Sequence, residues 1–253
     1  MYQFNHISKI YDLISKGLPN DLEFYLSEAQ NVKGKVLEIA CGTGRIFLEM
    51  LKNNVDAYGV DISKAMLDVL KNKAKQNNIN LEGRIFNQDM KNFKIQEKFD
   101  LIIIPYRSFL HNETIEDQLS TLNSCYQHLN PKGKLIINFF HYSPTVVAKR
   151  QKNKKKQLME IIKKEDYQLK IFDKSVDHFS DQKIDVTFYF EEKIKGEKLK
   201  KFEETFVIHW IGKREFEHLA ERSNFKVEHL YGDFKKNRFE NEMDELVWIL
   251  EKQ

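Results

Sequence analysis

Between residues 35 and 140, short apolar runs alternate with amphipathic segments, and this rhythm leaves few folds open to the chain. The apolar runs lie at residues 35–40, 56–62, 81–89, 99–108 and 134–140. The segments between them have helical spacing, and Ser63 stands where it can cap the helix that follows the second run. Strands that alternate with helices predict a parallel sheet covered on both faces.

The rhythm is interrupted after about residue 145. The segment 149–156 carries six Lys or Arg in eight residues, and we expect a helical stretch from there to about residue 165. Three β-like runs follow at about 167–211, and Lys195-Gly196-Glu197 is predicted to form the hairpin turn between the last two. An antiparallel meander within an α/β chain indicates a small inserted sheet that lies over one end of the main sheet.

The pattern of helix and strand resumes after the interruption and ends with a strand at 245–252. Residues 6–30 are predicted to form one or two helices, broken at 17–20. The whole pattern predicts a Rossmann-like, doubly wound α/β fold. Its expected parts are a main domain of residues 1–145 and 212–253, in which residues 1–30 form a helical cap, and an inserted antiparallel β lid of residues 146–211.

Composition limits the class of protein. Hydrophobic residues make up 41% and charged residues 31%, which suits a packed core rather than a disordered chain. The net charge of +3 gives no general case for a nucleic-acid or membrane partner. Cys41 and Cys125 cannot form a disulfide framework, the first residues do not resemble a signal peptide, and the apolar runs are too short to span a bilayer. We therefore expect a soluble, cytoplasmic protein.

The turn Ala40-Cys41-Gly42-Thr43-Gly44 joins the first predicted strand to the next helix. Glycines allow a ligand to approach the backbone closely, and the start of the helix offers free N–H groups. Asp61 lies 17 residues after Gly44, at the end of the second strand, where a carboxylate can accept hydrogen bonds from a ribose diol. Together these features predict a site for a nucleotide-like ligand, either NAD(P) or S-adenosylmethionine (SAM).

Two residues around the turn decide against NAD(P). The dinucleotide fingerprint has a third glycine where this chain has the large Phe47. Glu38 precedes the turn, and a carboxylate there repels a pyrophosphate but suits a cation. SAM carries a sulfonium and an ammonium group and no phosphate, so SAM is the predicted ligand.

With these motifs the chain resembles the class I SAM-dependent methyltransferases. The resemblance rests on the following motifs, in the order and spacing of that family: VLEIACGTGRIFLEML, GVDIS, NQDM, FDLIIIPYRS and LNPKGKLIINFF. It covers about residues 34–142 and the last predicted helix and two strands of the chain, which follow the inserted sheet. It implies a seven-stranded sheet whose last strand, ELVWILEK, runs antiparallel, and it implies no metal.

The resemblance also assigns roles in binding SAM. The methionine part would be held by Glu38, Ala40, Cys41, Gly42, Thr43 and Gly44, with Ala40 in place of the family's usual first glycine. The ribose and adenine would be contacted by Asp61, Ile62, Met66, Asp89 and the backbone N–H of Met90. Pro105 and Tyr106 would lie nearest the sulfonium.

Candidate catalytic residues come from two segments. His111 follows the fourth strand and resembles a histidine of the sugar N-methyltransferases, where a base near the acceptor amine is plausible. Tyr11 resembles an N-terminal helix tyrosine that closes over SAM. The inserted sheet resembles the lid of small-molecule N-methyltransferases, and from it Tyr189, His209 and Trp210 are candidates for reaching the acceptor. Arg107 is expected to form a surface ion pair rather than to meet an acidic substrate.

The function that follows from the resemblance is SAM-dependent transfer of a methyl group to the nitrogen or oxygen of a small molecule, by in-line displacement. Such a displacement needs a held nucleophile and exclusion of water rather than a metal. Two alternatives remain. The first is a nucleic-acid (RNA) methyltransferase, which is favoured by the basic segment 149–156 and disfavoured by the run Ile104-Pro105-Tyr106-Arg107. The second is a non-catalytic SAM-binding regulatory module. A homodimer stays open.

Overall fold

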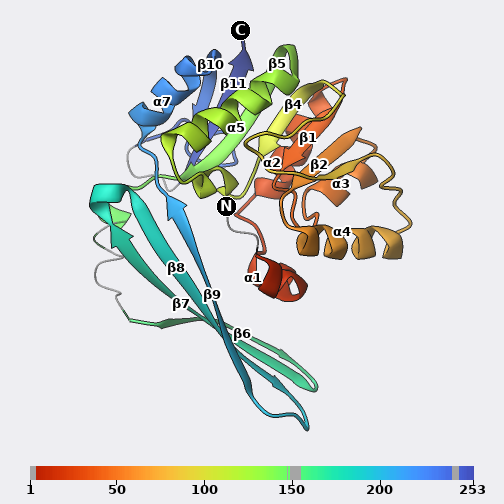
Figure 1. Ribbon diagram of the computed structural model, residues 1–253, viewed down its shortest axis with the longest axis vertical. Coiled ribbons are helices and arrows are strands. Elements are labelled where there is room, and N and C mark those ends of the chain that lie inside the picture. The colour runs from red at the N-terminus through yellow and green to blue at the C-terminus, as the bar shows by residue number, and fades with distance from the viewer. Residues whose placement is uncertain (1–3, 147, 149–154, 241–244) are drawn as a thin grey trace.

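The computed structural model of the protein describes residues 4–146, 148, 155–240 and 245–253, and Figure 1 shows two sheets of different character. The upper part is a seven-stranded sheet with helices on both faces, and the lower part is a separate four-stranded antiparallel sheet that projects away from it. No helix in the described part of the chain is long and apolar enough to cross a membrane.

The seven-stranded sheet has the order β10-β11-β5-β4-β1-β2-β3. Its strands are β1 (Val36–Ile39), β2 (Ala57–Asp61), β3 (Ile85–Asn87), β4 (Phe99–Ile104), β5 (Leu129–Phe140), β10 (Phe225–Tyr231) and β11 (Glu245–Lys252). Strands β1 to β5 run parallel to one another, whereas β11 is antiparallel to both β5 and β10. The predicted doubly wound fold with an antiparallel last strand is therefore confirmed.

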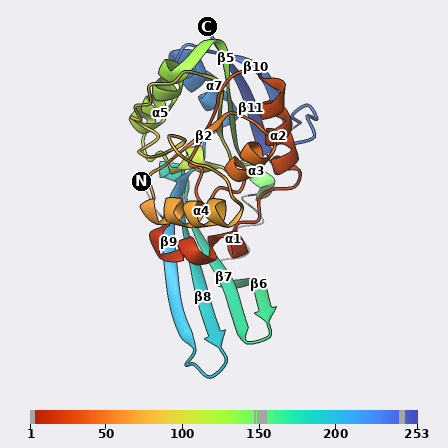
Figure 2. The ribbon, with the colours of Figure 1, turned by 90° about the vertical axis from the view of Figure 1, so that its right-hand side faces the viewer.

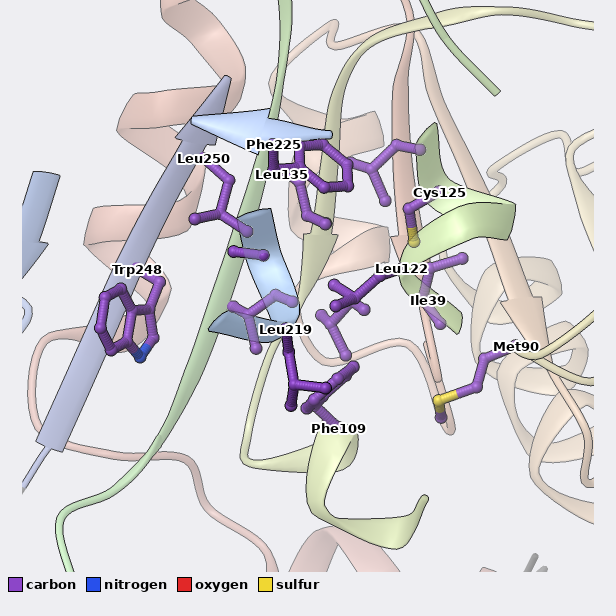
Figure 3. Close-up of a cluster of buried hydrophobic side chains, with 14 of the residues drawn as sticks. Ile39, Met90, Phe109, Leu122, Cys125, Leu135, Leu219, Phe225, Trp248 and Leu250 are labelled. Atoms are coloured by element: carbon purple, nitrogen blue, oxygen red, sulfur yellow. The ribbon is translucent and has the colours of Figure 1, made fainter. Parts of the chain in front are cut away.

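Within the described residues, five helices cover the two faces of this sheet: α2 (Asp21–Asn31), α3 (Phe47–Lys52), α4 (Lys64–Gln76), α5 (Ile115–His128) and α7 (Lys213–Arg222). Helices α5 and α7 bury one core, in which Leu122 and Leu219 meet Ile39 and Trp248 from the strands (Figure 3). Helices α2, α3 and α4 bury a second core on the opposite face, which includes Val36. Alternate residues of each strand thus enter opposite cores, which is why the strands read as continuous apolar runs.

Local signals set the helix that follows β2. Ser63 caps α4, because its hydroxyl accepts a hydrogen bond from the backbone N–H of Met66 at 3.1 Å. Because β1, β2 and β4 run parallel, their carboxyl ends lie at one edge of the sheet, with the helix starts beside them. In open α/β sheets ligands bind outside this edge.

The antiparallel sheet has the order β6-β7-β8-β9, formed by β6 (Gln157–Lys164), β7 (Tyr167–His178), β8 (Lys183–Ile194) and β9 (Lys200–His209). The hairpin between β8 and β9 turns at the expected position, where Gly196 has a φ of 81°. The predicted helical stretch up to about residue 165 is wrong, because this segment pairs with β7 as the strand β6. Pairing with a neighbouring strand overrides the helix propensity of its Leu, Met, Glu and Lys residues. Of the basic segment 149–156, residues 149–154 lie outside the described residues.

The N-terminal segment lies between the two sheets (Figure 2) and comprises the 3₁₀-helix η1 (Asn5–Ile10) and the short helix α1 (Tyr11–Ile14). Ile7 is fully buried in a third apolar cluster with Leu169, Ile171 and Phe190 of the antiparallel sheet. The segment therefore contacts the antiparallel sheet through apolar packing. Further along the chain, the 3₁₀-helix η2 (Ser108–His111) follows β4, and η3 (Phe179–Asp181) joins β7 to β8.

Candidate functional site

A cavity of about 380 Å³ opens where β1, β2 and β4 end. The ends of these strands contribute Ala40, Gly42, Asp61 and Tyr106 to its wall. The N-terminal segment contributes Phe4 and Tyr11, η2 contributes His111, and the antiparallel sheet contributes Val186, Phe188 and Phe206. A smaller adjoining cavity of about 50 Å³ is lined by Glu38, Cys41, Thr43 and Pro105. Most of the predicted site residues therefore lie around these two adjoining cavities.

The two glycines of the turn after β1 are required for different reasons. Both have positive φ, 53° for Gly42 and 86° for Gly44. A Cβ on Gly42 would meet only the Ala40 carbonyl oxygen, 4.0 Å away, so this position faces open space. A Cβ on Gly44 would lie 2.9 Å from Leu70 Cγ and 3.0 Å from Leu48 Cγ. Gly42 thus allows a ligand to approach the backbone, whereas Gly44 allows the helices to pack.

Ala40 occupies the place of the family's usual glycine and adopts a φ of 56°. The left-handed conformation costs a residue with a Cβ about 1 kcal/mol. Ala40 therefore adds backbone strain beside the cavity.

Asp61 holds the turn and the end of β2 together. Its carboxylate is buried and accepts hydrogen bonds from the backbone N–H of Gly42, at 2.8 Å, and of Ser63, at 2.7 Å. Burial raises the pKa of Asp61 to about 6, although the two backbone hydrogen bonds favour the charged form. The group is thus ionised at neutral pH and can accept further hydrogen bonds in the cavity.

Glu38 places a second carboxylate behind the turn. Its side chain is buried, and Oε2 has no hydrogen-bond partner among the described residues. Burial raises the pKa of Glu38 well above its usual range. The nearby Arg45 is engaged by Asp21 through hydrogen bonds of 2.9 and 2.6 Å. A buried carboxyl oxygen without a partner is costly, and a cationic ligand group such as an ammonium beside it would favour the charged form.

The predicted adenine side of the site is only partly as expected. Ile62, Met66 and Met90 line the cavity. Asp89 is not among the lining residues, and its Oδ1 accepts a hydrogen bond from the backbone N–H of Lys91 at 2.9 Å. Gln88 lines the cavity instead, and the sequence analysis missed it because the motif drew attention to the acid that follows. The proposed contact of Asp89 with adenine stays a prediction.

Tyr106 and Arg107 follow β4 with φ values of 55° and 65°, although neither is glycine. Two consecutive residues in the left-handed region indicate strain at this point of the cavity wall. Arg107 forms the expected ion pair, with Glu245 of β11, but this partner is buried. Glu245 Oε2 accepts a hydrogen bond from Asn138, whose own Oδ1 accepts one from Tyr25, so the pair is anchored in a buried network.

His111 lies between the cavity and β9. Its Nδ1 is 3.3 Å from the carbonyl oxygen of Val207, and since a carbonyl only accepts, Nδ1 carries the proton. Nε2 then keeps its lone pair. Burial lowers the pKa of His111 to about 4, so the ring is neutral at physiological pH. Phe4 and Phe206 contact the ring at centroid distances of 5.5 and 5.8 Å.

Tyr11 lines both cavities, and burial raises its pKa to about 12, so its hydroxyl stays protonated. The segment around it is tied to the ligand turn. Asp12 accepts a hydrogen bond from Thr43 Oγ1 at 2.5 Å and one from Lys73 at 2.8 Å. Ser63 Oγ donates to Asn5 Oδ1 at 2.7 Å. The N-terminal segment therefore covers the site.

The residues contributed by the antiparallel sheet differ from those expected. Tyr189, His209 and Trp210 are not among the lining residues, and Trp210 stacks on Tyr142 with ring centroids 4.6 Å apart. Instead the lining residues are Val186, Phe188, Phe206 and Ile208, with Met159, Asp173 and Ser175. Successive side chains of a strand point to opposite faces, so the prediction for Tyr189 and His209 chose the wrong face. Apolar and aromatic residues occur on both faces, and the sequence offered no signal to choose between them.

Comparison with known proteins places the fold among the methyltransferases. Residues 36–133 match the family model described as a methyltransferase domain. A solved structure, an S-adenosylmethionine-dependent methyltransferase from Clostridium acetobutylicum ATCC 824, shares the fold with a TM-score of 0.77 over 98% of each chain, at 20% identity. The chain therefore contains a methyltransferase domain and shares the fold of a SAM-dependent methyltransferase.

Curated relatives resemble this methyltransferase domain over part of their length. The match to the putative methyltransferase YqeM of Bacillus subtilis (strain 168) is 27% identical over 141 residues and covers 53% of this chain and 54% of the relative. The match to dTDP-3-amino-3,4,6-trideoxy-alpha-D-glucopyranose N,N-dimethyltransferase of Streptomyces venezuelae is 24% identical and covers 57% of this chain and 61% of the relative. The match thus spans little more than half of each relative.

Proposed function

We propose that this protein transfers the methyl group of SAM to the nitrogen of a small molecule. One observation carries the proposal: a single cavity is lined both by the glycine turn with Asp61 and by His111. The donor and a group able to take up a proton would then face each other. The relative from Streptomyces venezuelae, named as an N,N-dimethyltransferase of an amino sugar, supports nitrogen as the acceptor atom.

The residues around the turn fit SAM. The unpartnered Oε2 of Glu38 suits the ammonium group, and the open side of Gly42 leaves room beside the backbone. Asp61 would accept hydrogen bonds from the ribose hydroxyls, while Ile62, Met66 and Met90 would contact the adenine. Cys41, Thr43, Pro105 and Tyr106 would complete the wall around the methionine part. SAM supplies an electrophilic methyl group on its sulfonium.

His111 is suited to the proton that an amine loses during methylation. Its Nε2 lone pair is free of the Val207 contact, and the ring is neutral at physiological pH, so Nε2 is available to accept a hydrogen bond or a proton. Tyr11 and the N-terminal segment would exclude water from the site, which favours displacement at the methyl group over side reactions. We further propose that residues 1–145 and 212–253 act as the SAM-binding domain and residues 146–211 as the part that covers the acceptor.

Two measurements test the function. Calorimetry with SAM and S-adenosylhomocysteine (SAH) is expected to show binding, and a metabolite extract incubated with methyl-labelled SAM is expected to give a labelled amine. Absence of SAM and SAH binding would refute the proposed role of the turn. Binding without any labelled product would favour a non-catalytic SAM-binding module, and label in added RNA would favour a nucleic-acid methyltransferase.

A further inference from the structure

The short helix η2 carries His111, and it is held at both of its ends by buried hydrogen bonds. We propose that Glu245 and Thr121 are positioning residues, which keep His111 in place at the wall of the cavity. Neither residue is among those that line the two cavities, and each acts through a residue that borders η2. The inference rests on the proposed function, in which His111 takes up the proton of the acceptor.

The chain enters η2 through a strained turn. Tyr106 and Arg107 follow β4 with φ values of 55° and 65°, and Arg107 is the residue directly before the helix. The left-handed region is unfavourable for residues with a Cβ, so two such residues in succession persist only where their surroundings hold them. The side chain of Arg107 is held by two contacts: its guanidinium pairs with Glu245 and lies over the ring of Phe140, 5.4 Å from the ring centroid.

Glu245 is a firm anchor because its own carboxylate is held from behind. It is the first residue of β11 and is buried, and its Oε1 accepts a hydrogen bond from Arg107 Nε at 2.9 Å. Its Oε2 accepts a hydrogen bond from Asn138 Nδ2 at 2.9 Å, and Asn138 Oδ1 accepts one from the hydroxyl of Tyr25 at 2.9 Å. Asn138 and Tyr25 are fully buried, so this network fixes the carboxylate and, through Arg107, the start of η2.

Thr121 holds the other end of η2. Asn112 is the residue directly after the helix; it is fully buried, and its Nδ2 donates to the carbonyl oxygen of Phe109 at 2.9 Å. Its Oδ1 accepts a hydrogen bond from the hydroxyl of Thr121 at 2.9 Å, and Thr121 is itself fully buried in α5. A buried polar group that loses its partner is costly, so this pair resists any movement of the end of η2 relative to α5.

The two anchors matter because the ring of His111 is otherwise contacted by segments outside the main sheet. Its Nδ1 lies 3.3 Å from the carbonyl oxygen of Val207 in β9, and its ring contacts Phe4 and Phe206. The turn after β1 and Asp61, which would hold the donor, belong to the main sheet. Glu245 and Thr121 therefore fix His111 relative to the donor. An error of about 1 Å between reacting groups can cost about a hundredfold in rate.

Variants that change little in shape test each anchor against a matched control. Glu245→Gln removes the charge of the first anchor, and its control is Glu228→Gln, which breaks a more exposed ion pair on the neighbouring strand β10. Thr121→Val removes the hydroxyl of the second anchor. Its control is Ser124→Ala, which removes another buried hydroxyl of α5 that does not bond to η2 or its flanking residues. Thermal melting and SAH affinity report whether each variant folds.

A double-mutant cycle shows whether each anchor acts through His111. The rate of methyl transfer from saturating labelled SAM into a metabolite extract is measured for each variant alone and in combination with His111→Ala. Glu245→Gln and Thr121→Val are each expected to lower this rate about tenfold, with less than about a threefold change in SAH affinity. In the His111→Ala background either should lower it less than about twofold, because the base that they position is gone. An equal loss in both backgrounds, or an unchanged rate, would overturn the role of the residue concerned.

Nitrogen NMR of the labelled histidines in the SAH complex gives a readout that needs no acceptor. The spectrum of His111→Ala assigns the signals of His111, which are expected to show the proton on Nδ1. Glu245→Gln and Thr121→Val should shift or broaden these signals, whereas Glu228→Gln and Ser124→Ala should not. If His111→Ala transfers methyl groups at the original rate, the proposed base is wrong, and the spectra alone decide whether the anchors place the ring. Signals of His111 that neither anchor variant changes would overturn the inference.

Discussion

The cavity has one wall formed by the carboxyl ends of β1, β2 and β4 and a facing wall formed by β7, β8 and β9, and the two walls differ in how they would bind. The first presents backbone as well as side chains, with a glycine open to the cavity and the carboxylates of Asp61 and Glu38 beside it. The second is formed by strand residues, most of which are apolar.

This difference implies that the walls tolerate change differently. The first wall depends on a turn whose φ angles and packing leave few substitutions open. On a strand, by contrast, a side chain facing the cavity can change without moving the ladder of backbone hydrogen bonds. We expect donor binding to be constrained by backbone geometry and acceptor choice to be set by replaceable side chains.

The largest expected effect is on kcat, and it comes from His111→Ala, a change of the residue that lies between the two walls. Loss of the base should lower kcat about a hundredfold or more, because general base catalysis contributes on this scale. Affinity for SAH should change by less than about threefold, since the ring is not assigned to the donor. Steady-state kinetics and calorimetry measure the two effects. An equal loss of both would make His111 a structural residue.

The two glycines of the turn should separate stability from binding. Gly44→Ala is expected to lower the free energy of unfolding by about 2–4 kcal/mol, because its Cβ meets Leu70 and Leu48 in addition to the strain of positive φ. Gly42→Ala should cost only about 1 kcal/mol from the strain, yet weaken SAH binding. Urea unfolding and calorimetry on both variants test this. If Gly42→Ala loses the stability and Gly44→Ala loses only SAH affinity, the roles assigned to the two glycines are wrong.

The affinity for SAH should depend on pH through Asp61. Its raised pKa means that the carboxylate is ionised above about pH 6 and protonated below it. If the ionised form accepts the ribose hydrogen bonds, affinity is expected to fall about tenfold from pH 7 to pH 5. Asp61→Asn should bind more weakly by about 1–3 kcal/mol and lose this dependence. If the pH dependence of SAH affinity is unchanged in Asp61→Asn, another group is responsible for it, and Glu38 is the next to test.

The smallest expected effect concerns Ala40. Ala40→Gly should raise the free energy of unfolding by about 0.5–1 kcal/mol, since glycine adopts the observed φ of 56° without strain. The same substitution at the buried Ala57 of β2 is the control and should lower stability. Urea unfolding compares the two. A loss of stability in Ala40→Gly would show that the methyl group contributes packing that outweighs its strain.

Much of the first wall could be predicted because it is local in sequence. Ala40 and Gly42 follow β1 directly, and Asp61 ends β2, so their positions follow once the strands are recognised as parallel neighbours. Asp89 shows the limit of this reasoning. Which of two adjacent side chains enters the cavity depends on the turn after β3, and there Gln88 faces inward while Asp89 bonds to the backbone of Lys91.

The second wall could not be predicted to the same degree. The strand β6 was expected to be a helix, and its pairing with β7 decided otherwise. The choice between Phe188 and Tyr189 depends on which face of the sheet turns to the cavity, and both residues are aromatic. The anchor of Arg107 is Glu245, which lies 138 residues away in the sequence.

By itself the sequence determined the doubly wound sheet, the turn after β1 and the acid at the end of β2, because hydrophobic periodicity and glycine conformation act over a few neighbouring residues. Only the tertiary structure decided which face of the antiparallel sheet covers the cavity, that Arg107 is neutralised there, and that a carboxyl oxygen of Glu38 is buried with no hydrogen-bond partner among the described residues. These features arise from contacts between segments distant in the chain, and local preferences carry no information about them.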